Sequence, residues 1–242
     1  MSIIYSGPSL IDGQPIVAIA IASKSRNTKT GNMVQTYIIR ADQSPLEASK
    51  SGADYSICGN CPHRGIATVD PARKQAEKRS CYVNLGQGPT IVWKALKRNF
   101  YKPATGHDAI AAIGAGRMVR LGTYGDPAAV PSYIWESLIS RASGHTAYTH
   151  QSGVASAQAR PEFMMISADN RAQAEYAWQF GQRTFRVIKS VDEIVRGAEI
   201  ICPASKEAGF KTTCLKCGLC GGSSVKAKSI AIVDHGPQRK RA

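Results

Sequence analysis

Seven cysteines constrain this 242-residue chain more than any other feature, because all of them fall into two groups. The first cysteine group consists of Cys58, Cys61 and Cys81, and the second of Cys202, Cys214, Cys217 and Cys220. A Cys-x2-Cys spacing presents two thiolates from one turn at the bite distance of a tetrahedral metal ion. Buried cysteines can instead serve as small apolar residues, but this grouping favours metal ligands. We therefore expect one metal site at each group.

The second cysteine group offers the fuller ligand set. Its expected ligands are Cys214, Cys217, Cys220 and either His235 or Cys202. Four such ligands suit structural zinc. The first group has three cysteines with His63 close by, and three-cysteine sets also hold iron–sulfur clusters in which one iron keeps an open position. The sequence thus predicts zinc at the second group, and zinc or an iron–sulfur cluster at the first.

The basic charge of the chain is the second strong feature. The formal net charge is +14, and most of the excess lies in two segments that each adjoin a cysteine group. Residues 64–102 carry nine Lys or Arg and two acidic residues, and residues 206–242 carry eight and two. Such focused charge favours a phosphate-lined partner, DNA or RNA, over an ordinary solvated surface. On a predicted helix, Lys94, Lys97 and Arg98 share one basic face and are expected to contact the nucleic acid.

The order of apolar runs predicts an α/β fold. Residues 16–22 and 34–40 look like the strands of a hairpin, so that residues 1–50 form an N-terminal β-hairpin extension and residues 51–242 a catalytic domain. Further strands are expected near residues 54–57, 117–121, 145–149, 163–167, 184–188, 198–202 and 229–233. Helices are predicted to begin near residues 88, 131 and 170. This alternation implies parallel strands, in a compact, irregular (β/α) barrel or, alternatively, in an open doubly wound sheet.

Several missing patterns narrow the class of protein further. No apolar run approaches the roughly 18 to 20 residues of a membrane span. The first apolar stretch has no basic segment ahead of it and contains Asp12 and Pro15, which predicts a strand rather than a signal peptide. We expect a cytoplasmic protein with reduced thiols and without a membrane partner. The sequence patterns of Rossmann and P-loop nucleotide sites are also missing.

Acidic residues follow two of the predicted strands, at the place where parallel α/β folds carry their reactive groups. They are Asp126 and Asp169. Such a pair can divide labour, with one carboxylate attacking a sugar C1′ and the other recognising or deprotonating a base. A turn-forming role for Asp126 before Pro127, and a helix N-cap role for Asp169, are the structural alternatives.

Residues around these acids are expected to bind the substrate. His150 and Gln151 can hydrogen-bond a purine edge, and Tyr124 or Tyr148 can stack on a base. Gly125 directly precedes the first acid in a glycine-flanked loop. Because successive parallel strands end at one edge of a sheet, we expect all these groups to line a single binding site there.

The order of these features resembles that of the tRNA-guanine transglycosylase superfamily over roughly residues 110–236. The basic charge and modest length are similar to those of its phage branch, the DNA 7-deazaguanine transglycosylases. The resemblance implies a (β/α)8-type barrel and a transferase that exchanges guanine for a small 7-deazaguanine base in DNA. It also implies that Asp126 recognises the base, that Asp169 is the nucleophile, and that zinc is bound near the C-terminal end. The implied zinc ligands are Cys214, Cys217, Cys220 and His235.

Two other classes of protein fit the same features. One is an iron–sulfur or radical-type enzyme on the same barrel, although the Cys-x3-Cys-x2-Cys spacing typical of radical-SAM enzymes is missing. The other is a non-enzymatic, zinc-containing protein that binds nucleic acid. We favour the enzyme, because a pure binder seldom needs so many α/β units. The sequence does not decide between DNA and RNA, nor does it fix the oligomeric state.

Overall fold

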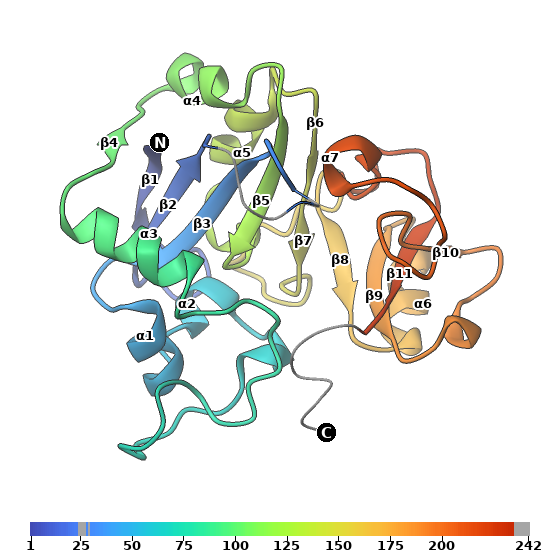
Figure 1. The fold of residues 1–242 in the computed structure, drawn as a ribbon, viewed down its shortest axis with the longest axis horizontal. Helices are drawn as coiled ribbons and strands as arrows, with labels where there is room; N and C mark the ends of the chain where they lie inside the picture. Colours follow the sequence, from blue (N-terminus) through green and yellow to red (C-terminus); the bar gives the residue numbers. More distant parts are fainter. Residues whose placement is uncertain (24–27, 29, 235–242) are drawn as a thin grey trace.

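The chain folds into two open β-sheets that lie side by side, with helices around them (Figure 1). The computed structural model describes residues 1–23, 28 and 30–234. Neighbouring strands of the first sheet follow the order β4-β1-β2-β3-β5-β6, and those of the second the order β10-β11-β9-β8-β7. The α/β class that the sequence predicts is confirmed.

Most of the elements are short. The strands of the first sheet are β1 (Ser2–Pro8), β2 (Pro15–Ile21), β3 (Val34–Arg40), β4 (Lys102–Pro103), β5 (Met118–Tyr124) and β6 (Gly144–Thr146). Those of the second are β7 (Tyr148–Thr149), β8 (Met165–Ala168), β9 (Thr184–Ile188), β10 (Glu199–Ile201) and β11 (Ser229–Val233). The α-helices are α1 (Pro45–Ser51), α2 (Tyr55–Cys58), α3 (Gly88–Lys97), α4 (His107–Gly114), α5 (Ser132–Ile139), α6 (Arg171–Gln179) and α7 (Cys214–Cys217). The 3-10 turns are η1 (Pro62–Arg64), η2 (Pro127–Ala129) and η3 (Val191–Glu193).

The predicted N-terminal hairpin is confirmed. β2 and β3 pair antiparallel, from Ile16 opposite Arg40 to Ile21 opposite Gln35. Both strands are rich in β-branched residues, which pack well on a pleated surface. β3 also pairs in parallel with β5, and β5 with β6. The strands of the first 50 residues therefore belong to the same sheet as later ones.

The described strands of the second sheet are all parallel, as the alternating pattern predicts. Helix α6 connects β8 to β9, and its N-cap Asn170 accepts a hydrogen bond from the Gln173 N–H. The chain passes between the sheets from β6 to β7, with the buried Ala147 in between. The Ala147 N–H donates to the Cys220 carbonyl, and its carbonyl accepts from the Met165 N–H. This crossing ties the two sheets together.

The expected barrel is wrong. Among the described strands neither sheet closes on itself, because β4 and β6 are the edges of the first sheet and β7 and β10 those of the second. In a (β/α) barrel the first and last strands pair with each other, and a helix after each strand covers the outside. Here segments 59–87 and 202–228 are mostly loops. The strand expected near residues 54–57 is also wrong, because this run forms the short helix α2, in which the Cys58 N–H donates to the Asp54 carbonyl.

The main hydrophobic core lies between the first sheet and the helices packed on it. Leu121, Trp135 and Leu138 are fully buried there. The Trp135 indole N–H donates to the Pro127 carbonyl at 2.8 Å, which fixes α5 against the loop after β5. Helices α3, α5 and α6 begin where the sequence predicts. None of the helices in the described ranges combines the length and the apolar character that crossing a bilayer requires.

Candidate metal centre

Three segments that are distant in the sequence meet beside the ends of β7 and β8. His63 lies in η1, His150 follows β7 and Asp169 follows β8. One ligand atom from each side chain lies within 4.8 Å of the other two. In the described part of the chain, this is the one group of three or more His, Cys, Asp or Glu ligand atoms that are so close together. We call it the His-His-Asp cluster.

The Asp169 carboxylate is the centre of the cluster. Its Oδ1 lies 3.3 Å from Nε2 of His63 and 3.2 Å from Nε2 of His150. The two imidazole rings meet edge to face, with centroids 5.8 Å apart. The side chains are 39%, 19% and 26% exposed for His63, His150 and Asp169. An ion or a substrate can therefore reach the cluster from solvent.

The cluster members shift each other's protonation. Burial by itself lowers the pKa of His150, but hydrogen bonds to Asp169 and Cys61 outweigh it and raise the pKa to about 10. Burial by itself raises the pKa of Asp169, but hydrogen bonds from His150 and His63 hold it well below its usual range. Without a metal ion, the cluster therefore pairs a carboxylate with a protonated imidazole. A divalent ion held by these side chains would take the place of that proton, because metal ligation requires neutral imidazole.

Two imidazole nitrogens and one carboxylate oxygen form a ligand set that suits zinc and iron(II). The second ring nitrogen of His63, Nδ1, lies 2.8 Å from the Ser80 hydroxyl. The His150 side chain also hydrogen-bonds the Cys61 thiol. Metal-ligating histidines usually have such a partner, which fixes the orientation of the ring and tunes its basicity. The surroundings of the cluster therefore match those of a metal centre.

A buried amide connects the cluster to the Cys-x2-Cys turn. Gln151 is 0% exposed, and its Nε2 donates to the Cys58 carbonyl at 2.7 Å and to Asp126 Oδ2 at 3.0 Å. Its Oε1 accepts from the Asn60 N–H at 3.1 Å. The same Asp126 oxygen accepts from the His150 N–H at 2.8 Å. The turn and His150 are therefore held in a fixed relation, and both N–H groups of the Gln151 amide are used in doing so.

The Asp126 carboxylate is likewise occupied by the protein. It accepts hydrogen bonds from the backbone of Ala128 and His150 and from the side chains of Gln151 and Thr149. Burial outweighs these bonds and raises its pKa. Four donors fill about four acceptor positions of a carboxylate. The geometry favours a positioning role for Asp126 over contact with a base.

Glycine at position 59 makes the close approach possible. Its φ is 50°, and a Cβ there would lie 2.0 Å from Gln151 Oε1, so a larger residue would displace the amide. On the other side of the turn, Arg64 pairs with Asp54 at 2.6 Å and donates to the Gly59 carbonyl at 3.1 Å. The run Cys-Gly-Asn-Cys-Pro-His thus folds as a firmly held turn that ends at His63.

The thiols of the first cysteine group lie beside the cluster. Burial raises the pKa of Cys58, and the nearby thiols of Cys61 and Cys81 add to the rise. The three thiols therefore share one neighbourhood. Among the described residues, however, their sulfurs do not form a set within 4.8 Å of one another. A metal or iron–sulfur cluster on these three cysteines stays a prediction.

The second cysteine group belongs to α7 and the loops around it. Cys220 is buried, burial raises its pKa to about 12, and its thiol hydrogen-bonds the Tyr148 hydroxyl. The thiols that raise this pKa further are those of Cys202, Cys214 and Cys217. No three sulfurs in the described ranges lie within 4.8 Å of one another, and His235 lies outside those ranges. Zinc at this group also stays a prediction.

The residues predicted to stack on a base pack within the protein instead. Tyr124 is 4% exposed and belongs to the main core. The Tyr148 ring lies against Phe185, with centroids 4.7 Å apart. Gly125 has a φ of 83°, and a Cβ there would lie 2.7 Å from the Cβ of Ile38. The structure thus brings His150, Asp169, Gln151 and Asp126 together, while the rings of Tyr124 and Tyr148 pack against other protein side chains.

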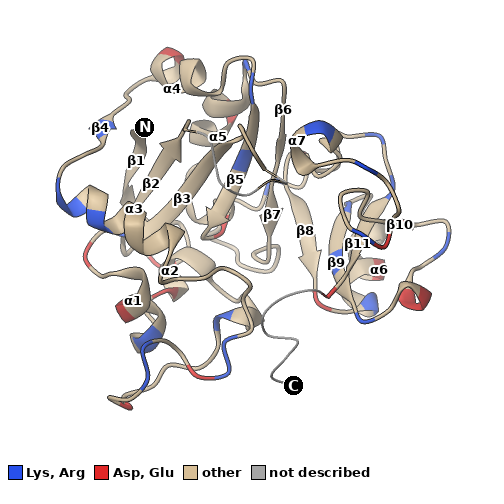
Figure 2. Ribbon diagram, viewed as in Figure 1, with Lys and Arg blue, Asp and Glu red and all other residues tan. Residues whose placement is uncertain are grey.

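The predicted nucleic-acid contacts on α3 are solvent-exposed. Lys94 and Lys97 of this helix and its C-cap Arg98 are exposed. Lys97 also donates to the Ala41 carbonyl at 3.0 Å. Basic segments lie on α3, in β5 and on α7 (Figure 2).

A cavity of about 400 Å³ opens beside Asp169. Residues of the loop after β8, of β9 and of η3 line it. Its charged members besides Asp169 are Arg171, Arg186, Lys189, Asp192 and Glu193. The cavity therefore provides room for a substrate next to the cluster.

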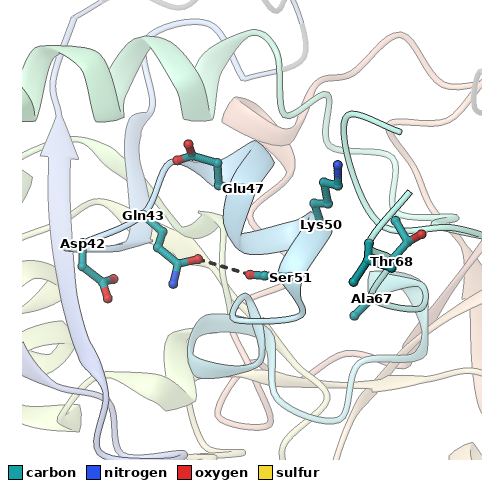
Figure 3. Close-up of a pocket in the computed structure, with 8 residues that line it drawn as sticks. Asp42, Gln43, Glu47, Lys50, Ser51, Ala67 and Thr68 are labelled. Atoms are coloured by element: carbon teal, nitrogen blue, oxygen red, sulfur yellow. Dashed lines mark hydrogen bonds between the residues drawn. The ribbon is translucent and has the colours of Figure 1, made fainter. Parts of the chain in front are cut away.

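A larger hollow of about 890 Å³ lies between α1 and residues 67–69 (Figure 3). Its two carboxylates already have partners, since Asp42 pairs with Arg40 and Glu47 closes the capping box with Ser44. Because its acidic groups are engaged, we assign no chemistry to this hollow.

Comparisons with known proteins add no relative. No protein-family model matches the chain, and no match is found among the curated proteins or the solved structures.

From the sequence, His63 is expected only as a neighbour of the first cysteine group, and Ser80 has no expected role. A signal for His63 does exist, because Pro-His directly follows the Cys-x2-Cys motif. Ser80 carries no such signal, since its contact with His63 depends on how residues 64–79 fold back.

Proposed function

We propose that this protein is a metal-dependent enzyme that modifies nucleic acid, with one divalent ion held by His63, His150 and Asp169. The observation that carries the proposal is the convergence of two imidazole nitrogens on one carboxylate oxygen, at 3.3 and 3.2 Å. Three protein ligands leave positions open for water or substrate, as in catalytic zinc and non-haem iron sites. The +14 charge supports a phosphate-bearing substrate.

When bound, such an ion polarises a substrate oxygen or turns a bound water into a stronger nucleophile at neutral pH. The residues of the chain supply the remaining functions. Ser80 and Cys61 orient the two imidazole rings. Arg171 and Lys189, in the wall of the cavity beside Asp169, provide positive charge for a phosphate. The cavity also limits how a substrate can approach the metal position.

Base exchange by a transglycosylase is the second candidate, with a 7-deazaguanine base as the incoming group. The observation that favours it is the Asp169 carboxylate, which stays ionised and is 26% exposed beyond the end of a parallel strand. A carboxylate in that state can attack a sugar C1′, so that a C1′–O bond forms as the glycosidic bond to guanine breaks, and the incoming base then displaces the carboxylate from C1′. In this candidate the second cysteine group holds zinc and Asp169 stays free of metal. The two candidates thus differ in what Asp169 binds.

Nucleoside analysis tests both candidates. DNA and RNA from cells that express the wild type, His63→Ala, Asp169→Ala or His107→Ala are digested separately and analysed by mass spectrometry. His107→Ala is the matched control, because His107 bonds the Ser137 hydroxyl outside the cluster. We expect a modified nucleoside with the wild type and the control, and none with either cluster variant.

Treatment of purified protein with a chelator separates the remaining outcomes. Activity that disappears on chelation and returns with zinc or iron(II) supports the metal centre. Activity that survives chelation and His63→Ala but not Asp169→Ala selects the transglycosylase. Tight nucleic-acid binding without any modified nucleoside selects the non-enzymatic zinc protein, and a brown, anaerobically purified protein selects the iron–sulfur enzyme.

A further inference from the structure

Most buried guanidinium groups of this protein have clear partners. The ion pairs are Arg40 with Asp42, Arg64 with Asp54 and Arg186 with Glu199. Arg183 has no ion pair among the described residues, and its Nε is without a partner there, but its Nη atoms donate to three backbone carbonyls. Arg120, in the middle of β5, has no acidic partner among the described residues, and its buried Nε has no hydrogen-bond partner there. A buried cation is costly unless an anion pairs with it.

A second unpaired donor lies next to Arg120. β5 pairs in parallel with β3 and β6, and Arg120 lies in register with Gln35 on one side and Thr146 on the other. In-register residues of neighbouring strands point to the same face of a sheet. The Gln35 Oε1 accepts from the Thr123 hydroxyl at 2.8 Å, but its buried Nε2 has no partner among the described residues. Two adjacent strands thus present two unsatisfied donors on one face.

Tyr82 connects this pair of donors to the surface. Its hydroxyl accepts a hydrogen bond from Arg120 Nη2 at 2.7 Å, while the residue itself is 64% exposed. The ionisable neighbours of Arg120 are Tyr82, Tyr148 and Cys214, none of which is a carboxylate. Among the described residues, the charge of Arg120 therefore has no carboxylate beside it and lies next to an exposed ring.

We propose that Arg120, Gln35 and Tyr82 form a binding site for a phosphate group, separate from the His-His-Asp cluster. Arg120 Nε and the Gln35 amide donate to phosphate oxygens, and the exposed Tyr82 ring offers a face on which a base can stack. A phosphodiester of single-stranded nucleic acid and free phosphate share this chemistry. Such a site gives the substrate of the proposed enzyme a second anchor, and phosphate binding there does not require the metal centre.

Binding of a labelled single-stranded oligonucleotide tests the site. Wild type, Arg120→Gln and Arg141→Gln are compared over a range of salt concentrations, after circular dichroism has verified their folding. Arg141→Gln removes the same charge from an exposed residue that pairs with Asp108. We expect Arg120→Gln to weaken binding about tenfold and to lower the salt slope by about one, and the control to change affinity less than about twofold. A folded Arg120→Gln protein with wild-type affinity and slope overturns the proposal.

A second measurement uses the wild-type protein and so does not depend on the folding of a variant. Phenylglyoxal modification of Arg120 and Arg141 is followed by peptide mass spectrometry, with and without the oligonucleotide or inorganic phosphate. We expect both probes to slow modification of Arg120 and not of Arg141. Protection by inorganic phosphate alone assigns the site to the free anion. An unchanged modification rate for Arg120 with both probes overturns the proposal. The same measurement on Asp169→Ala separates the two proposals, because protection of Arg120 in that variant shows that the phosphate site does not depend on the metal centre.

Discussion

The two cysteine groups differ in what surrounds them. The thiols of the first group lie beside two imidazoles and an ionised carboxylate that are partly open to solvent. In the second group, Cys220 packs into a small apolar cluster with Met165 and Ile230 and bonds the Tyr148 hydroxyl. Similar motifs thus lie in two different environments. Mixed nitrogen and oxygen ligands with solvent access suit a reactive centre, whereas a thiol-rich loop whose Cys220 is buried suits a structural role.

The largest expected effect is a loss of metal binding in only one of the two regions, the His-His-Asp cluster beside the first cysteine group. We expect Asp169→Ala to weaken binding of the catalytic ion roughly 100-fold or more, because it removes the central ligand. Cys217→Ser in the second group should leave that affinity unchanged. Titration calorimetry with zinc on chelator-treated protein measures both. Equal losses in the two variants would mean that the regions share a single site.

The next effect concerns pH in the chelator-treated protein. The folded pKa of His150 is raised to about 10, so its stabilising contribution is complete below its ordinary pKa and is lost as the pH rises toward 10. We expect the difference in unfolding free energy between wild type and His150→Gln to fall by about 2 kcal/mol from pH 6 to pH 10, less than the full shift because solvent screens the pair. Urea denaturation at several pH values measures it, and a constant difference argues against the His150–Asp169 ion pair.

Sequence patterns predicted much of this fold because they depend on local chemistry. The β2–β3 hairpin and the helices that begin at Gly88 and Ser132 follow from β-branched runs and helix-start signals. The sequence has no such local signal for the division into two sheets, because this division depends on how β6 continues into β7 through a single residue, Ala147.

The cluster was only half predictable for a related reason. His150 and Asp169 follow strands, and parallel strands bring such residues to one edge. His63 reaches the same place through a loop held by Gln151 and Asp126, and those buried hydrogen bonds cannot be read from spacing. For the same reason, Asp126 looked catalytic in the sequence, although its carboxylate is filled by the protein's own donors.

A smaller effect tests the hydrogen bond behind the cluster. Ser80→Ala removes the partner 2.8 Å from His63 Nδ1 and should weaken metal affinity about tenfold, with little change in overall stability. Ser190→Ala is the control, because Ser190 is the N-cap residue of η3 and is not part of the cluster. Competition with a fluorescent chelator measures both affinities. Equal affinities for wild type and Ser80→Ala would show that His63 is oriented by other contacts.

The smallest effect concerns the second region. Cys220→Ala removes a buried sulfur from the apolar cluster and should lower the free energy of unfolding by about 1 kcal/mol in metal-free protein. Cys61→Ala, at a partly exposed position, should cost less. Urea denaturation of the two variants ranks them. A larger loss for Cys61→Ala would reverse the assignment of reactive and structural regions.

The most direct test is an anomalous diffraction map of metal-loaded crystals, recorded at the absorption edge of the bound element. We expect a peak about 2.0 to 2.2 Å from Nε2 of His63, Nε2 of His150 and a carboxylate oxygen of Asp169. A metal-replete crystal whose only peaks lie among the cysteine sulfurs, with none at the His-His-Asp cluster, would contradict the proposed centre.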